Sequence, residues 1–402
     1  MKATQSTADP HRLQSPTRPL GSSPPTPAAA RVAVCYGTRP QVIKASRLLG
    51  ALRRDWDVVS IDTGQHYDYE LNALLYEQLG IRRPDLFLDV GSGTHAVQTA
   101  AILTRAAEAF ARYRPAAVVV IGDTNSTLGC ALAAAKARIP VVHVEAGLRA
   151  HDMLMAEEIN RRCVDATSSV LCAPSAAALE TLRAERAPGR AVLTGDVAYD
   201  VLLEQLPTLP RTSRAGDAEW QAGEYVFATL HRAELTDRID VLRCVLQTLD
   251  SMPLPIVMAV HPRTKAVLTE HALVTRSGGS LQLVPPVGYL ESLALTKNAA
   301  AVVTDSGGLQ REAYWLGVPC ITLRAESEWT ETVELGANQL LPPTDAPDAL
   351  PERVADAIRA HRSWDRTAYG DGRAAERIRE CVQECLDAPR GRAHVSTTAS
   401  SP

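Results

Sequence analysis

Aromatic residues are scarce in this 402-residue sequence, where 5 Trp, 10 Tyr and 3 Phe together make up 4%. Aromatic side chains are the largest apolar groups, so a chain with few of them must build its interior mainly from Ala, Val, Leu and Ile. Hydrophobic residues still make up 46% of the sequence and charged residues 22%, as in ordinary globular proteins. The length predicts two domains of ordinary size.

An excess of charge of either sign is also absent. The 42 Lys and Arg residues nearly balance the 46 Asp and Glu residues, for a net charge of −4. This balance argues against the electrostatic capture of nucleic acid or of an anionic membrane surface. The longest apolar runs, 116–121 and 128–135, fall far short of the ~18 residues that a membrane-spanning helix needs. We therefore expect neither a nucleic-acid partner nor a membrane partner.

Paired cysteines are missing as well. The eight cysteines include no C-x-x-C pair, and only Cys381 and Cys385 lie close together, at the i,i+4 spacing of a helix. Most of the others stand inside apolar runs. This pattern favours reduced, buried thiols in a cytoplasmic protein over disulfides or a metal site, and we predict no bound metal.

The two ends of the chain lack apolar residues to bury. Residues 1–30 contain six prolines and four charges but no aromatic residue and no continuous apolar segment. Such a segment cannot offset its chain entropy by burial, which predicts a disordered extension without a secretory signal. Residues 388–402 are similarly polar and are predicted to form a loose tail.

Between the ends, short apolar runs alternate with longer helical patterns. The runs do not alternate polar with apolar residues, which predicts parallel strands covered on both faces. Residues 206–222, with Pro207, Pro210 and Gly216, break the alternation and read as a linker. We predict an α/β protein with one Rossmann-like domain over 31–205 and another over 223–365, followed by a helix over 366–387 that packs back on either unit. The ligand is expected between the domains, beyond the strand ends.

Several common signatures of enzymes do not occur. The first strand is not followed by G-x-G-x-x-G, and the chain has no G-x-x-x-x-G-K-[ST], H-E-x-x-H or G-x-S-x-G. These absences argue against a nicotinamide enzyme, a P-loop ATPase and a zinc hydrolase.

The first predicted strand ends in a turn that suits an anion. Gly37-Thr38-Arg39-Pro40 joins it to a helix that carries Lys44. Backbone amides, Arg39 and Lys44 then surround one point, as phosphate sites require. The alternative is an ordinary tight turn with solvated cations.

Carboxylates follow the strands in the middle of the first domain. Asp123 and Glu145 stand at two strand ends, and Glu157 and Glu158 open the next helix. Asp123 could merely cap a helix, and the Glu pair could merely favour a helix N-terminus. Taken together, Asp123, Glu145 and one of the Glu pair gather at one edge of the sheet. Carboxylates in a dry cleft have separated pKa values and suit general acid–base chemistry.

The second domain supplies groups for a phosphate and a ribose. His231 and His261 follow two successive strands. Ser306, Gly307 and Gly308 join a strand to a helix, so that a hydroxyl and two amides can point at a phosphate. Glu312 in the same helix could accept hydrogen bonds from a ribose. The alternative for the glycines is a turn that needs positive φ angles.

In this order the motifs resemble the non-hydrolysing UDP-N-acetylglucosamine 2-epimerase family. The matching blocks are Gly37–Lys44, Thr63–His66, Gly122–Thr124, His143–Arg149, Glu157–Arg161, His231–Glu234, Asp305–Glu312 and Tyr369–Ile378. The resemblance implies a GT-B fold that closes on a UDP-sugar, a homodimer and no cofactor. It also implies the reaction: UDP leaves C1 as a carboxylate removes the C2 proton, and UDP returns after the opposite face has been protonated.

The resemblance also implies a role for each matching residue. Acid–base and charge-stabilising roles fall to Asp123, Glu145 and Glu157, and His231 assists the departing diphosphate. Phosphate or sugar contacts fall to Arg39, Lys44, His261, Ser306, Gly307 and Gly308, and the ribose contact to Glu312. Gln65 and His66 match a motif that forms a second, activating UDP-sugar site in the bacterial enzymes.

Three positions depart from the family pattern. Ala156 replaces a Pro before the paired glutamates, Leu235 replaces an Asn after H-R-x-E, and Gln41 replaces a Glu after G-T-R-P. We expect the first to loosen the acid-bearing loop and the second to remove a polar group close to His231. A hydrolysing 2-epimerase, a GT-B glycosyltransferase and a catalytically idle UDP-sugar sensor therefore stay open as alternatives.

Overall fold

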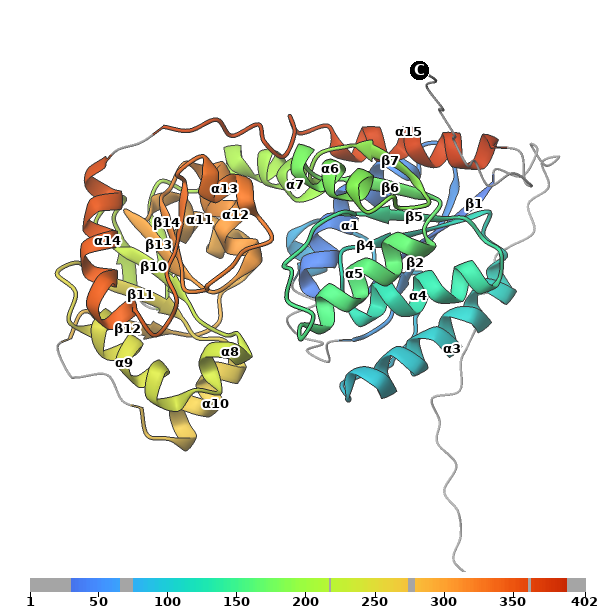
Figure 1. Cartoon of the computed structure of the whole chain (residues 1–402). Coiled ribbons are helices and arrows are strands. Elements are labelled where there is room, and N and C mark those ends of the chain that lie inside the picture. The colour runs from blue at the N-terminus through green and yellow to red at the C-terminus, as the bar shows by residue number, and fades with distance from the viewer. Residues whose placement is uncertain (1–29, 66–74, 217, 274–278, 361–362, 389–402) are drawn as a thin grey trace, which may run out of the picture.

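The structure is a computed structural model that describes residues 30–65, 75–216, 218–273, 279–360 and 363–388. It consists of two α/β units that lie side by side (Figure 1). The predictions for residues 1–30 and 388–402 fall almost wholly outside the described residues, and so does His66.

The first unit is built on a seven-stranded parallel sheet of order β3-β2-β1-β4-β5-β6-β7. Its central strand β4 reads AVVVI and is buried at every position, because helices cover both faces. The strands are β1 (Arg31–Tyr36), β2 (Asp57–Asp62), β3 (Leu86–Phe87), β4 (Ala117–Ile121), β5 (Val141–Val144), β6 (Val170–Ala173) and β7 (Arg190–Leu193).

Different helices cover the two faces of this sheet. Ile102, Cys130 and Val164 pack from α3, α4 and α5 against one face, and Val42, Val201 and Ile378 pack from α1, α7 and α15 against the other (Figure 1). The helices are α1 (Arg39–Leu52), α3 (His95–Tyr113), α4 (Asn125–Lys136), α5 (Ala156–Thr167), α6 (Ala176–Ala184), α7 (Val197–Gln205) and α15 (Ala374–Asp387).

The second unit has a six-stranded parallel sheet of order β12-β11-β10-β13-β14-β15. Its strands are β10 (Val226–Thr229), β11 (Ile256–Ala259), β12 (Leu281–Val284), β13 (Ala301–Thr304), β14 (Cys320–Thr322) and β15 (Asn338–Leu340). Its helices are α8 (Ala233–Thr236), α9 (Ile239–Asp250), α10 (Pro262–Glu270), α11 (Tyr289–Asn298), α12 (Gly307–Leu316), α13 (Thr330–Glu334) and α14 (Ala346–Ala360). The predicted parallel sheets are thus confirmed in both units.

Each sheet has one point where the strand order reverses, between β1 and β4 and between β10 and β13. Loops on the two sides of such a point diverge beyond the carboxyl ends of the strands and leave a crevice for a ligand. Asp123 follows β4, while His231 follows β10 and Ser306 follows β13. The sequence therefore brings its candidate residues to the two crevices.

Several elements differ from the sequence prediction. Helices α7 and α14 and strand β15 were not predicted. The expected linker 206–222 contains a 3₁₀ turn (Leu206–Thr208) and an antiparallel ribbon of β8 (Ser213–Ala215) and β9 (Ala218–Trp220). Ser213 donates to the carbonyl oxygen of Ala294 at 2.8 Å, so the ribbon packs on α11. The exact domain boundaries stay predictions.

The C-terminal helix α15 packs on the first unit, which decides between the two options that the sequence left open. The Asp200 carboxylate of α7 accepts the backbone N–H groups of Ala374 and Ala375, at 3.1 and 2.8 Å. These amides have no partner within their own helix, so Asp200 anchors its start. The chain thus returns to its first unit after it has completed the second.

Candidate active site

The two units meet at a cluster of four buried charged groups. Glu145 follows β5 and lies between Lys44 of α1, which contacts Oε2, and Arg311 of α12, whose Nη1 is 2.9 Å from Oε1. Arg311 also pairs with Asp196, the N-cap of α7. One guanidinium of the second unit therefore joins two carboxylates of the first.

This cluster keeps Glu145 ionised. Burial by itself would raise the pKa of Glu145, but the charges and hydrogen bonds of Lys44 and Arg311 outweigh burial and hold that pKa below its ordinary value. The Arg311 guanidinium also lies 3.7 Å from the ring centroid of Trp329, which covers it from water. Both oxygens of Glu145 are engaged, so its negative charge has a fixed place.

Asp123 is held differently, through one oxygen only. Arg161 donates to Oδ2 from Nε and Nη2, at 2.9 and 2.6 Å, and Asn160 donates to the Asp123 carbonyl oxygen at 2.8 Å. The Asp123 side chain is 29% exposed, against 5% for Glu145. Among the described residues, no contact to Oδ1 is found, and this oxygen is the one that can exchange a proton with a ligand.

The paired glutamates of α5 separate into two environments. Glu158 is fully buried and accepts from the backbone N–H of Ala150, from Arg161 and from Arg162. Glu157 is exposed in the first turn of α5, and within the described residues it makes no hydrogen bond to Asp123 or Glu145. The structure therefore gathers Asp123 and Glu145, but it does not bring Glu157 into contact with them.

His231 and His261 lie together, as their places at successive strand ends predict. Their ring centroids are 5.3 Å apart. Asp305 orients His231, because its Oδ2 accepts the backbone N–H groups of His231 and Arg232 at 2.8 Å and its Oδ1 lies 3.2 Å from Nδ1 of His231. His261 caps α10 and accepts the backbone N–H of Arg263. Asp305 thus fixes the backbone of the turn that carries His231, and its Oδ1 lies close to the imidazole.

The turn that carries Ser306 opens α12. Ser306 is the N-cap and accepts the N–H of Leu309. Gly307 and Gly308 both belong to α12 and neither has a positive φ angle, so a left-handed turn is not their reason. A Cβ on Gly307 would lie 2.7 Å from Glu328 Oε1 and 3.3 Å from Trp329 Nε1. Gly307 is required by the close approach of Glu328 and Trp329 to the start of the helix.

Glu312 follows Arg311 in α12, and its pKa is raised. Burial, with Asp196 nearby, raises the pKa of Glu312 to about 7, although Arg311 acts in the opposite direction. Its neutral and ionised forms therefore coexist near neutral pH. Either form can accept a hydrogen bond from a hydroxyl group.

The first turn of α1 lies against the Asp123 loop through Gln41. Its Oε1 accepts the N–H groups of Gly37 and Thr38, while its Nε2 lies 2.6 Å from the Ile121 carbonyl oxygen and 2.9 Å from Thr124 Oγ1. A glutamate at this position has no proton to donate to those oxygens when ionised, whereas Gln41 joins the two turns. Arg39 is the first residue of α1 and Lys44 faces Glu145. The predicted anion turn and the acid–base loop are one assembly.

The other two departures lie outside these hydrogen bonds. Leu235 is 1% exposed and packs in the apolar core of the second unit. Ala156 is the first residue of α5, whose N-cap Met155 makes no side-chain capping bond.

Gln65 reaches the same region from the end of β2. Its Oε1 accepts from the backbone N–H and the Oγ of Ser126, at 3.0 and 2.6 Å. Ser126 stands in the first turn of α4, three residues after Asp123. The activating role of Gln65 stays a prediction, and His66 lies outside the described residues.

Comparison with known proteins decides the family. Residues 51–383 match the family model described as UDP-N-acetylglucosamine 2-epimerase, which is most of the chain. The chain belongs to the UDP-N-acetylglucosamine 2-epimerase family. It is 38% identical over 360 residues to the UDP-2,3-diacetamido-2,3-dideoxy-D-glucuronate 2-epimerase of Pseudomonas aeruginosa, a match that covers 87% of this chain and 98% of that one.

Solved structures support the same membership. The crystal structure of the Methanocaldococcus jannaschii UDP-GlcNAc 2-epimerase in complex with UDP-GlcNAc and UDP superposes with a TM-score of 0.79 and 35% identity, covering 88% of this chain and 99% of that one. The calicheamicin glycosyltransferase CalG4 shares the fold alone, with a TM-score of 0.52 and 15% identity over 91% of this chain and 100% of that one. The GT-B fold predicted for this family member is confirmed.

Sequence reasoning missed the cations of this epimerase-family site. Arg161 and Arg311 stand inside two of the matching blocks, yet neither was predicted to be a site residue. Helical spacing could have indicated Arg161, which lies four residues after Glu157 and so on its side of α5. Nothing in the sequence indicates that Arg311 reaches Glu145, because that contact forms only when the two units pack together.

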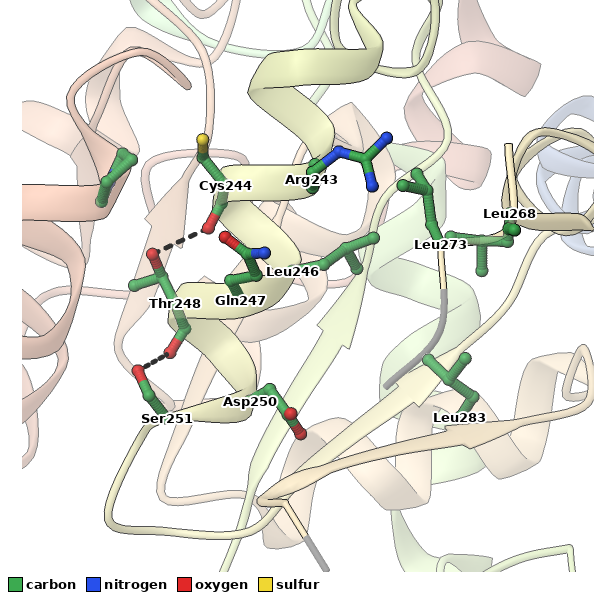
Figure 2. A pocket seen from close by; sticks show the side chains of 12 residues that line it. Arg243, Cys244, Leu246, Gln247, Thr248, Asp250, Ser251, Leu268, Leu273 and Leu283 are labelled. Atoms are coloured by element: carbon green, nitrogen blue, oxygen red, sulfur yellow. Dashed lines mark hydrogen bonds between the residues drawn. The ribbon is translucent and has the colours of Figure 1, made fainter. Parts of the chain in front are cut away.

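A separate pocket of ≈ 500 Å³ lies on the second unit of this family member. Figure 2 shows Arg243, Gln247 and Asp250 of α9 on one side of it and Leu268 and Leu283 on the other. None of its lining residues is a predicted site residue. We therefore assign the candidate active site to the strand ends.

Two further features of the described residues concern other partners. No helix among them combines the length and the apolar character that crossing a membrane requires. No cluster of three or more His, Cys, Asp and Glu side chains in the same ranges has the arrangement of a metal site. The eight cysteines are free thiols, of which Cys163 and Cys244 are exposed rather than buried as predicted.

Proposed function

We propose that this chain is a UDP-sugar 2-epimerase without hydrolytic activity, which interconverts UDP-GlcNAc and UDP-ManNAc or a modified UDP-2-acetamido sugar. Its membership of the family supports this proposal. The names of its relatives indicate UDP-GlcNAc or a diacetamido uronate as the sugar nucleotide. Such a reaction needs a carboxylate at C2 and a site for the diphosphate at C1.

The observation that carries the proposal is the contrast between Glu145 and Asp123. Glu145 is buried and locked between Lys44 and Arg311, whereas Asp123 is tethered through Oδ2 alone. A locked anion stabilises the positive charge that develops on the sugar when UDP leaves C1. A carboxylate with one free oxygen can take up the C2 proton.

The diphosphate would lie at the N-terminus of α12, where the amides of Gly307 and Gly308 and the Ser306 hydroxyl favour an anion. Arg311 stands four residues into that helix, so the helix that would hold the diphosphate also carries the cation that pairs with Glu145. His231, fixed by Asp305, would donate to the departing diphosphate, with Arg39 and His261 beside it and Glu312 at the ribose.

Protonation from the opposite face requires a second acid. Glu157 is our candidate, since it is exposed at the start of α5 and lies one helical turn from Arg161, the partner of Asp123. We propose that closure on the ligand brings Glu157 to the sugar.

We further propose that the protein acts as a cytoplasmic homodimer. Val97, Met153, Leu154 and Ile159 are apolar yet 66%, 55%, 95% and 45% exposed. Asn125 hydrogen-bonds to Gln98 of α3 and to Asn160 of α5, so the helix ends that carry Val97 and Ile159 are neighbours. Burial of these side chains by a second copy would stabilise a dimer, and light scattering on native protein and on Leu154→Glu tests this.

NMR of the products tests the proposed reaction. The protein is incubated in D₂O with UDP-GlcNAc and, in parallel, with the diacetamido uronate derivative. Deuterium at C2 of a nucleotide-linked epimer is the expected result. Free ManNAc with UDP would indicate hydrolysis, UDP release that needs an acceptor would indicate transfer, and unchanged substrate with tight binding would indicate a sensor.

A further inference from the structure

A buried histidine lies between the two carboxylate loops. His143 is on β5, it is fully buried, and both of its ring nitrogens have partners. Nδ1 lies 2.7 Å from Asp165 Oδ1 and Nε2 lies 2.8 Å from the Gly122 carbonyl oxygen. Gly122 directly precedes Asp123 in the chain.

The proton positions follow from the partners. A carbonyl oxygen only accepts, so Nε2 must carry a proton. Asp165 also accepts from Arg149, at 2.8 Å, and from the backbone N–H of Gly147, at 3.2 Å, which leaves it acceptor-only. Nδ1 of the same ring pairs with Oδ1 of Asp165, so His143 bridges this carboxylate and the Gly122 carbonyl oxygen.

His143 belongs to a row of hydrogen-bonded groups. Burial alone would raise the pKa of Asp165, but His143 and Arg149 outweigh burial and hold it below the ordinary value. Arg149 in turn donates to Glu185 at 3.0 Å. The row thus runs from the buried His143 through Asp165 and Arg149 to Glu185 at the surface.

Two members of the row hold the two carboxylate loops. His143 fixes the carbonyl group before Asp123, and Asp165 fixes the amide of Gly147, two residues after Glu145. Glu145 itself has φ +70°, a left-handed conformation that is unfavourable for a residue with a side chain. Such a conformation persists only where surrounding contacts impose it. The hydrogen bond from the Gly147 N–H to Asp165 is one of these contacts.

We infer that the buried His143–Asp165 pair is a positioning device that holds the Asp123 loop and the Glu145 loop at a fixed separation. The inference rests on the proposed acid–base roles of Asp123 and Glu145. His143 and Asp165 act through those residues and do not touch the sugar. A shift of about 1 Å between acid–base groups lowers a rate by about 10²-fold, so the separation matters.

Kinetics with a matched control tests the inference. Asp165→Asn replaces the carboxylate that pairs with His143 and is expected to lower kcat for C2 proton exchange by about 10²-fold, with UDP affinity unchanged. The control is Asp200→Asn, which alters another buried aspartate that accepts two backbone amides but lies at the start of α15. Both variants lose stability, and only Asp165→Asn should lose kcat. An equal loss of kcat in the two would overturn the inference.

Nitrogen-15 NMR of the histidine rings gives a second readout that needs no turnover. The native protein should show one ring Nε2–H that exchanges slowly with solvent, assigned by its loss in His143→Gln, because Nε2 donates to the buried Gly122 carbonyl oxygen. A His143 ring whose Nε2–H exchanges freely would refute the device. If the native protein exchanges no C2 proton with any UDP-sugar, the proposed function fails, and the hydrogen bond of His143 Nε2 still decides this inference.

Discussion

The two units hold their candidate residues in different ways. In the first, Glu145 is 5% exposed between two cations, and Asp123 is clamped by Arg161. In the second, His231 is 34% exposed and the start of α12 is half-buried. The difference indicates that the charged groups of the first unit are fixed by partners within the protein. Those of the second unit would gain a partner when a diphosphate binds. Arg311 is the exception, because it belongs to the second unit and serves the first.

The largest expected effect comes from removing the proton acceptor. Asp123→Asn keeps the shape and the bond to Arg161 but cannot take up a proton, so C2 exchange should fall by at least about 10³-fold. Calorimetry should find UDP bound with native affinity. Asp237→Asn, which alters an exposed ion pair with Arg263, is the control with native exchange. C2 exchange at the native rate in Asp123→Asn would contradict the proposed division of roles between the two units.

Removing Arg311 tests the link between the units. Arg311→Met leaves Glu145 and Asp196 without their shared cation, and the free energy of unfolding at pH 7 should fall by about 3 kcal/mol. Arg311→Lys keeps the charge and should recover part of this loss, as urea unfolding can measure.

The sign of the pH dependence follows from Glu145. Its pKa is lowered in the folded state, so its stabilising effect is present above its unfolded pKa of about 4.3 and is lost as pH falls below it. The difference between Arg311→Met and the native protein should therefore shrink towards acid pH. A difference that does not change with pH would contradict the assignment.

Glu312 predicts the opposite pH dependence. Its pKa of about 7 lies above the unfolded value, so the native protein loses stability as pH rises between about 4.3 and 7. Glu312→Gln has no such proton, and its stability relative to native should rise by about 3 kcal/mol across that window. Unfolding at pH 5 and pH 8 measures this, and equal differences at both values would show that Glu312 has an ordinary pKa.

The smallest effect is expected at the start of α12. Ser306→Ala removes one hydrogen bond to the diphosphate, so KM should rise by about tenfold while kcat stays native. Because Ser306 also caps α12, circular dichroism must first show that the helix is intact. A fall in kcat without a change in KM would show that Ser306 takes part in the chemical step, which would contradict the proposed difference between the two units.

Much of this arrangement could be predicted from the sequence, because it depends on local patterns. The sequence predicts strands over 31–36, 117–121 and 301–304, and β1, β4 and β13 have these bounds, since their apolar runs end at a glycine or a polar residue. Asp123 and Glu145 follow neighbouring parallel strands and therefore lie at one edge of the sheet, as expected. The pairing of Lys44 with Glu145 was not expected, because Lys44 was predicted to contact a phosphate.

What could not be predicted depends on tertiary contacts. Arg311 reaches Glu145 across the interface between the units, and no sequence spacing describes that approach. Burial alone separates Glu158 from Glu157, which are equivalent in the sequence. Helix α14 contains Pro351, a residue that argues against a helix, although packing of Leu350 and Val354 stabilises it there.

Deuterium incorporation at C2, measured at saturating UDP-sugar in Asp123→Asn and Ser306→Ala together, tests the division of roles most directly. The account predicts no incorporation with Asp123→Asn and incorporation at the native rate with Ser306→Ala. Incorporation by Asp123→Asn, or its loss in Ser306→Ala at saturation, would contradict it.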